Sequence, residues 1–153
     1  MVPRPPGDHG YDLGCRFAGA PDNVVEICAR HCDAVSYNLY TRDVGDWRLP
    51  RDIDAPVLLS EFHFGAPDRG PFGRSLIDCH SQEGRAAAIV RFLEGALRNP
   101  QVVGAHWHQF SDQATTGRFD GEYFQVGLTD VCDLPYPETV AAFRHFAESM
   151  YKA

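Results

Sequence analysis

The segment PVLLSEFHFGAPDRG, Pro56–Gly70, starts as an apolar strand and ends by presenting a carboxylate, an imidazole and a loop. Proline is tolerated at the first position of a strand, because the N–H that it lacks is not needed there. Alternation with period two predicts two strand faces, with Leu59, Glu61 and His63 on one and Ser60, Phe62 and Phe64 on the other. If the aromatic face packs on helices, Glu61 and His63 point toward the open carboxyl end of the sheet.

Apolar runs and amphipathic stretches alternate along the rest of the chain, which is typical of consecutive βα units with a parallel sheet. Strands are expected at residues 11–19, 33–40, 56–64 and 101–110, and helices at residues 20–32, 81–100 and 137–152. The long connections, residues 41–55, 65–80 and 111–136, all follow strands. Ligands bind at the carboxyl ends of parallel strands, so these loops are expected to build one functional face.

The predicted fold class is α/β, with four parallel βα units that make half of a (β/α)8 TIM barrel. A complete barrel needs roughly 250 residues, whereas this chain has 153. Residues 1–10 are expected to form an irregular arm, and residues 11–153 the half-barrel domain. Four strands left open would expose two sheet edges and an apolar interior. A homodimer that closes an eight-stranded barrel is therefore predicted, with an open doubly wound sheet in a monomer as the competing architecture.

The net charge of −7 and the lack of clustered Lys and Arg disfavour nucleic-acid and anionic-membrane partners. A neutral substrate fits this composition better. No apolar run is long enough to cross a membrane, and the N-terminal segment lacks the apolar centre of a secretory signal. A cytoplasmic protein with neither membrane nor nucleic-acid partner is therefore expected.

Four strings carry a family resemblance: VSYNLY, LLSEFHFGAPDRG, VGAHWHQFSDQATTGRFDGE and YFQVGLTDVCDLPYPE. They resemble the C-terminal half of retaining glycoside hydrolases with (β/α)8 barrels, most closely the agarase and β-galactosidase-like members. The resemblance implies that Glu61 is the catalytic nucleophile and that Trp107 is a sugar-stacking platform. From the residues alone, Glu61 could also be a solvated carboxylate at a strand end, and Trp107 could belong to the core. It also implies that Tyr37, Asn38 and Tyr40, at the tip of the preceding strand, contact the substrate.

One part of the family pattern is missing, because the acid/base carboxylate of such enzymes follows a strand that this chain does not contain. A retaining mechanism needs two carboxyl groups about 5–5.5 Å apart. Asp112 and Glu122, after the last strand, are the candidates for the second group. In a two-fold dimer, the last strand of one copy takes the place of the missing strand, so a partner's carboxylate is expected to complete the site. Asp and Gly also form turns, so a purely structural role stays open for both.

Further substrate-binding candidates lie at the predicted strand ends: Arg16, His63, His106, His108 and Gln109. An alternative role in ion pairs with the loop carboxylates is open for Arg16, and for Arg69 or Arg118 in the loops. The histidines, together with His80, are also candidate metal ligands, because imidazole is a common ligand. Their spacing lacks a helical HxxxH pair or a Cys partner, so sugar contacts or orientation of Glu61 are favoured. No metal and no cofactor are expected.

The leading hypothesis is a β-glycosidase that cleaves a galactose-containing or related neutral saccharide, with Glu61 as nucleophile and Glu122 or Asp112 as proton donor. The first alternative is a non-catalytic, vestigial half-barrel that still binds saccharides. The second is a metal-dependent hydrolase that uses the histidines.

Overall fold

The computed structural model describes residues 13–17, 20–70 and 73–152, and side chains from residue 20 onward. The predicted arm at residues 1–10 lies outside the described residues. The elements in chain order are β1 (Leu13–Phe17), α1 (Asp22–His31), β2 (Ala34–Asn38), the 3₁₀ turn η1 (Pro50–Asp52), β3 (Val57–Phe62), α2 (Gln82–Arg98), β4 (Val102–Trp107) and α3 (Pro137–Ser149). Each predicted strand and helix therefore has a counterpart, and only a 3₁₀ turn interrupts the connection after β2.

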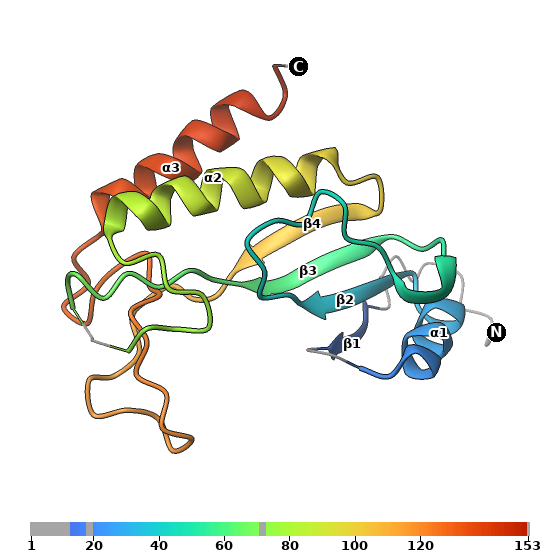
Figure 1. The fold of residues 1–153 in the computed structure, drawn as a ribbon, viewed down its shortest axis with the longest axis horizontal. Helices are drawn as coiled ribbons and strands as arrows, with labels where there is room; N and C mark the ends of the chain where they lie inside the picture. The colour runs from blue at the N-terminus through green and yellow to red at the C-terminus, as the bar shows by residue number, and fades with distance from the viewer. Residues whose placement is uncertain (1–12, 18–19, 71–72, 153) are drawn as a thin grey trace, which may run out of the picture.

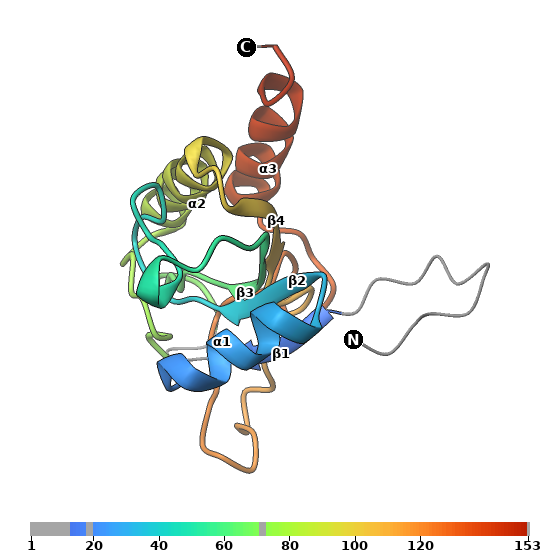
Figure 2. The same cartoon turned by 90° about the vertical axis from the view of Figure 1, so that its right-hand side faces the viewer.

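The four strands form one parallel sheet in the order β1-β2-β3-β4 (Figure 1). Helices α2 and α3 pack against each other above the β3 and β4 end of the sheet, and α1 contacts β1 and β2 (Figure 2). Among the described residues, β1 and β4 each have one hydrogen-bonded neighbour. None of the described helices is long and apolar enough to span a membrane.

Helix α2 forms where the sequence predicts it, because a cap and an apolar stripe coincide there. The Ser81 hydroxyl accepts a hydrogen bond from Gly84 N, which satisfies one of the free N–H groups of the first turn. Phe92 is completely buried, and its ring stacks on Phe62 of β3 at 4.3 Å between centroids. Phe62, on the aromatic side of β3, thus packs on a helix.

The strict alternation predicted for β3 is wrong, because a β-bulge interrupts the strand. Leu59 pairs with Ala105, and Phe62 pairs with Trp107, so two residues of β3 stand opposite one residue of β4. Leu59 is completely buried and belongs to the same core cluster as Phe62. The extra residue changes the direction of the side chains that follow Leu59, which is a frequent function of bulges near active sites. As a result, the side chains of Glu61 and Ser60 belong to the same hydrogen-bonded group.

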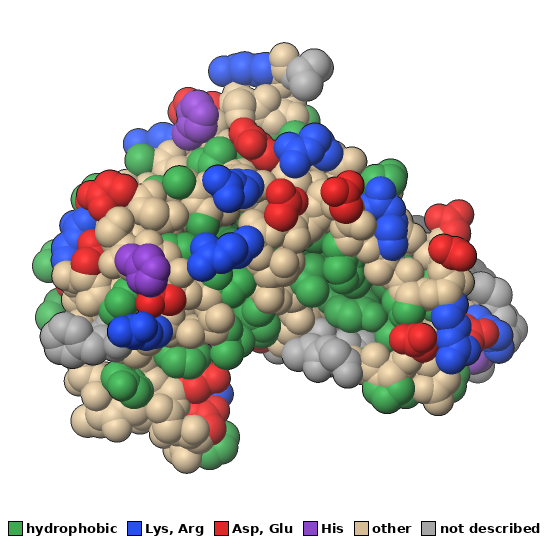
Figure 3. All heavy atoms as spheres, in the orientation of Figure 1, with side chains coloured by type: hydrophobic (Ala, Val, Ile, Leu, Met, Phe, Trp, Pro, Cys, Tyr) green, Lys and Arg blue, Asp and Glu red, His purple; other side chains and the backbone are tan. Residues whose placement is uncertain are grey.

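The long connections leave the carboxyl ends of β2, β3 and β4 at one end of the sheet (Figure 1). The loop after β4 runs from residue 108 to residue 136 and includes a lobe that projects from the body, with a notch beside it (Figure 3). The prediction that the long loops gather on the strand-to-helix side is confirmed by this arrangement.

Candidate active site

Glu61 lies at the carboxyl end of β3 and is held by two donors from β2 and the loop that follows it. Its Oε2 accepts a hydrogen bond of 2.6 Å from the Tyr40 hydroxyl and one of 2.8 Å from Asn38 Nδ2. Asn38 Oδ1 in turn accepts from the Ser60 hydroxyl at 2.9 Å, so the amide orientation is fixed from both sides. The backbone is held as well, because Leu39 N donates to Glu61 O at 2.9 Å. The carboxylate is therefore pre-oriented, with its side chain 18% exposed.

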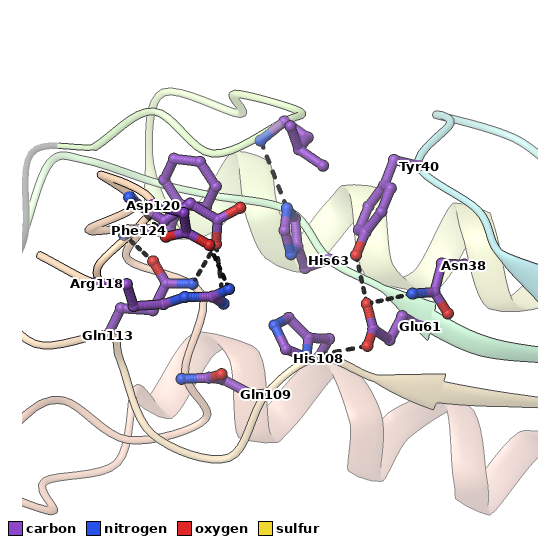
Figure 4. Close-up of polar contacts among 12 residues, drawn as sticks. Asn38, Tyr40, Glu61, His63, His108, Gln109, Gln113, Arg118, Asp120 and Phe124 are labelled. Carbon is purple, nitrogen blue, oxygen red and sulfur yellow. Dashed lines mark hydrogen bonds and ion pairs between the residues drawn. The ribbon is translucent and has the colours of Figure 1, made fainter. Parts of the chain in front are cut away.

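His108 lies beside the other carboxylate oxygen. Its Nδ1 is 3.8 Å from Glu61 Oε1, and its backbone N donates to Phe62 O at 2.9 Å. The imidazole is 24% exposed, so it can contact a ligand and Glu61 together. Figure 4 shows His108 and His63 between Glu61 and a second polar cluster.

His63 is buried and neutral, and its side chain lines the same site. It is 3% exposed, and its ring lies 4.7 Å from the Tyr40 ring and 5.9 Å from the His108 ring. Nε2 accepts a long hydrogen bond of 3.5 Å from Leu76 N, and Nδ1 is buried without a hydrogen-bond partner. Burial, followed by the nearby His108, lowers the pKa of His63 from 6.5 to about 4. The ring therefore supplies polarity to the site without charge at neutral pH.

The depressed pKa of His63 gives a testable pH dependence of stability. Between about pH 6.5 and pH 4, the unfolded chain binds a proton at His63 that the folded protein does not bind. The free energy of unfolding should therefore decrease as the pH falls, by about 1–2 kcal/mol between pH 7 and pH 5. Urea unfolding at the two pH values should show a smaller loss for His63→Phe than for the wild type. His145→Gln, on an exposed part of α3, is the control, and equal losses in all three proteins would contradict the assignment.

The second polar cluster comes from the loop after β4. Arg118 pairs through Nη2 with Asp120 at 2.6 Å and through Nη1 with Glu122 at 3.1 Å. Glu122 Oε2 also accepts a hydrogen bond of 2.9 Å from Gln113 Nε2. The negative charge of Glu122 contributes to raising the pKa of Tyr40, after burial and the hydrogen bond to Glu61. Arg118 opposes this rise, so the two members of the ion pair act on Tyr40 in opposite directions.

Asp112, the other predicted second carboxylate, anchors the loop. Its Oδ2 accepts a hydrogen bond of 2.6 Å from the Tyr136 hydroxyl, and its Oδ1 accepts one of 2.7 Å from Gly127 N. Burial raises the pKa of Asp112, while Tyr136, Gly127 and Arg85 oppose that rise. Both oxygens are engaged and the residue is 6% exposed, so this geometry favours the structural role that was open for Asp112.

Trp107 lies on the helix side of the sheet. Its ring makes edge contacts with Phe62 at 5.3 Å and with Phe143 of α3 at 5.4 Å, and Nε1 donates to Val126 O at 2.9 Å. Tyr37 is likewise part of the core, 7% exposed and 5.0 Å from the Trp47 ring. Packing, rather than a sugar platform or a substrate contact, is the role that this geometry favours for both.

The remaining candidates are dispersed. Gln109 lies near the cluster and donates through Nε2 to Ser111 O at 2.8 Å (Figure 4), whereas His106 is exposed on β4. Arg16 lies on β1, and its side chain is outside the described part of the chain. His80 is largely exposed and lies 3.2 Å from Asp78. No three His, Cys, Asp or Glu side chains among the described residues are grouped as metal ligands.

The sequence did not single out Gln113 or Asp120, and it indicated Arg118 only as an ion-pair partner of the loop carboxylates, a role that its contact with Glu122 fits. Arg118 was available as a loop cation, and the glycines on either side of it, Gly117 and Gly121, are a turn signal. Gln113 is 3% exposed and bonds across the base of the loop, and nothing in the local sequence distinguishes it from other glutamines.

The chain is similar to segments of known agarases. No protein-family model matches it. It is 38% identical over 150 residues to β-agarase B of Vibrio sp. (strain JT0107), which covers 94% of this chain and 16% of that protein. It is 40% identical over 154 residues to β-agarase A of the same strain, which covers 94% of this chain and 15% of that protein. The chain thus spans less than a fifth of the curated relatives that it matches.

Solved structures give the same result. The crystal structure of an agarase has a TM-score of 0.85 and 41% identity, covering 92% of this chain and 21% of that one. An exo-β-agarase has a TM-score of 0.86 and 39% identity, covering 92% of this chain and 20% of that one. A β-glucuronidase of Bifidobacterium dentium, at 20% identity and a TM-score of 0.56 over 88% of this chain and 23% of that one, shares the fold alone.

Proposed function

We propose that the chain is the nucleophile-bearing part of a β-glycosidase that cleaves a galactose-containing, neutral saccharide of the agarose type. The carrying observation is Glu61, held at the carboxyl end of β3 by Tyr40 and Asn38 and flanked by His108. The similarity to agarases over most of the chain supports the substrate class. Because the chain covers only a small part of those proteins, both the activity and the substrate are proposals.

In the proposed mechanism Glu61 attacks the anomeric carbon as the glycosidic C–O bond breaks, and the leaving oxygen takes a proton from an acid/base carboxyl. Water then hydrolyses the glycosyl-enzyme, which releases the sugar and frees Glu61. Attack requires a carboxylate whose direction is fixed before the substrate arrives. The two hydrogen bonds to Oε2 provide this orientation, and they leave Oε1 on the side of His108. His108 is placed to contact a sugar hydroxyl next to the reacting bond.

Tyr40 is the positioning residue with the strongest expected effect on this step. Burial and the bond to Glu61 raise the pKa of its hydroxyl, so it stays protonated and donates throughout the pH range of interest. A hydrogen bond to a charged group contributes about 1.5–3 kcal/mol, so Tyr40→Phe should lower kcat about ten- to a hundredfold. Tyr151→Phe, at an exposed position after α3, is the matched control and should leave kcat near the wild-type value. Equal kcat values for Tyr40→Phe and the wild type would remove Tyr40 from this role.

The proton donor is the second requirement, and Glu122 is the candidate within this chain. Its Oε2 is occupied by Gln113 and Arg118, contacts that suit a charged acceptor better than an acid. We therefore place the acid/base carboxyl in the half of the barrel that this chain does not supply, and assign Glu122 to holding the loop.

A comparison of leaving groups tests this placement of the acid. Glu122→Gln should lower the turnover of 2,4-dinitrophenyl and of unsubstituted phenyl β-galactosides by similar factors, because neither step would use Glu122 as donor. If the substitution impaired only the phenyl glycoside, whose leaving group needs a proton, Glu122 would be the acid.

The open sheet supports closure by a second half-barrel. The free edge of β4 borders an apolar groove of about 400 Å³ lined by side chains of α2, β4 and α3, and Val103 in it is 66% exposed. Uncovered edges and apolar grooves favour association. We propose that four further strands close the barrel, from a second copy or from a separate half. The mass in solution distinguishes the two sources: a dimer supports closure by a second copy, and a strict monomer contradicts a second copy and leaves a separate half.

The vestigial saccharide-binding alternative is favoured by one observation, the small share of its relatives that the chain covers. Saccharide binding without turnover of any activated glycoside would support it. The metal-dependent alternative gains no support from the described residues, among which no group of three potential ligands is present.

A further inference from the structure

Residues 114–123, which we call the post-β4 hairpin, form a turn of defined shape. Gly117 N donates to Ala114 O at 2.8 Å, Arg118 N donates to Glu122 O at 2.7 Å, and Gly121 N donates to Arg118 O at 3.0 Å. Gly117 and Gly121 both have positive φ, at 80° and 86°, a conformation that favours glycine. The hairpin therefore has its own hydrogen-bonded framework.

Gln113 fixes the base of the hairpin to the body of the loop. Its backbone N donates to Phe124 O at 3.2 Å, and its side-chain Oε1 accepts from Phe124 N at 2.7 Å. Its Nε2 reaches Glu122 at 2.9 Å, so one buried side chain joins the two arms. The side chains at the tip are presented in a fixed direction by this base.

An aromatic ring stands at that tip. Phe119 is 100% exposed, the highest value among the large hydrophobic residues of the described chain, and Tyr123 on the same hairpin is 44% exposed. Trp107, by contrast, is partly buried and packs against Phe62 and Phe143. An exposed phenyl ring gains free energy when an apolar surface covers it, and the C–H face of a sugar is such a surface.

The charges around Phe119 favour a neutral ligand. Arg118 carries one positive charge against the two negative charges of Asp120 and Glu122, so the group has a net charge of −1. In Figure 3, acidic side chains lie along the edge of the projecting lobe that borders the notch. Arg118 is therefore engaged internally, and an anionic saccharide would meet net repulsion.

We propose that the post-β4 hairpin is a separate saccharide-binding subsite, in which Phe119 stacks on a neutral sugar unit beyond the one bound at Glu61. Phe124, at the base of the hairpin, lies 6.0 Å from the His63 ring, and His108 lies between His63 and Glu61, so the hairpin is on the Glu61 side of the molecule (Figure 4). The ligand is therefore an oligosaccharide or polysaccharide. The hairpin binds a sugar unit away from the scissile bond, so the affinity should depend on the length of the saccharide. This inference rests on the saccharide class of the proposed function but not on hydrolysis.

Calorimetric titration of the full chain with an agarose-derived hexasaccharide and disaccharide tests the subsite. Phe119→Ala should weaken hexasaccharide binding about tenfold, with a much smaller change for the disaccharide, and Phe119→Trp should restore affinity. Tyr151→Ala removes an aromatic ring that is 87% exposed at the far end of α3, and it should bind both ligands as the wild type does.

Equal hexasaccharide affinities for Phe119→Ala and the wild type would overturn the subsite. An equal loss of affinity for both ligands would overturn it too, and so would the absence of hexasaccharide binding by the wild type. A change of mass in solution caused by Phe119→Ala would show that Phe119 lies in a protein interface instead. Turnover of 2,4-dinitrophenyl β-galactoside is measured separately on the wild type. Length-dependent binding without turnover would support the subsite and refute hydrolysis. Turnover with no effect of Phe119→Ala on binding would support hydrolysis and refute the subsite.

Discussion

Glutamine in place of Glu61 is expected to lower turnover of 2,4-dinitrophenyl β-galactoside by at least roughly a thousandfold, because the substitution removes the attacking oxygen of the proposed nucleophile. Gln keeps the size of the side chain, and its amide oxygen can still accept from Tyr40 and Asn38. The fold and the ground-state contacts should therefore survive, and the loss should appear in kcat rather than in KM.

The leaving group makes this experiment specific for Glu61. Dinitrophenolate departs without a proton, so the first step does not depend on an acid that the chain does not supply. Glu94→Gln, at an exposed position of α2, is the matched control and should retain wild-type turnover. Turnover that survives Glu61→Gln would exclude Glu61 as nucleophile. A fall that Glu94→Gln shares would point to a general effect on the preparation.

Methionine in place of Arg85 is expected to lower the free energy of unfolding by about 3–5 kcal/mol, because it removes one partner from a buried charged network. Arg85 on α2 is completely buried and donates through Nε to Thr139 Oγ1 at 2.9 Å and through Nη1 to Gln125 Oε1 at 3.2 Å. Its guanidinium lies 4.7 Å from the centre of the Tyr136 ring, whose hydroxyl bonds to Asp112.

Burial lowers the pKa of Arg85 to about 10, so the guanidinium is charged at neutral pH and favours the charged form of Asp112. Without it, Asp112 would remain buried with less compensation. Urea unfolding near neutral pH measures the difference. Arg91→Met removes an exposed arginine from the same helix and should change the unfolding free energy by less than about 0.5 kcal/mol. A loss below about 1 kcal/mol for Arg85→Met would mean that the network is not what holds the loop.

The parallel sheet was predictable because it follows from local pattern, and the family resemblance pointed to Asn38 and Tyr40 at the tip of the strand beside Glu61. Apolar runs identify strands, and the carboxyl ends of neighbouring parallel strands must lie at the same edge. Polar residues at the ends of β2 and β3 are therefore brought together whatever the details of packing.

The side to which each residue points was not predictable where the strand is irregular. The bulge at Ser60 and Glu61 contains neither Gly nor Pro, so no sequence signal breaks the alternation. Trp107 has polar neighbours in sequence, yet its ring packs on Phe62 and Phe143. Phe143 lies on a helix 36 residues further along the chain, so no local pattern could indicate this contact. Contacts between residues so distant in sequence are set by tertiary packing.

The most direct test of the central claim is mass spectrometry after incubation with 2,4-dinitrophenyl 2-deoxy-2-fluoro-β-galactoside. The fluorine slows both formation and hydrolysis of the glycosyl-enzyme, whereas the activated leaving group speeds only its formation, so the covalent intermediate accumulates. The account predicts one added fluorosugar per chain, located by peptide mapping on Glu61 and absent from Glu61→Gln. An adduct on another residue, or rapid turnover with no adduct at all, would contradict the assignment of Glu61 as the nucleophile.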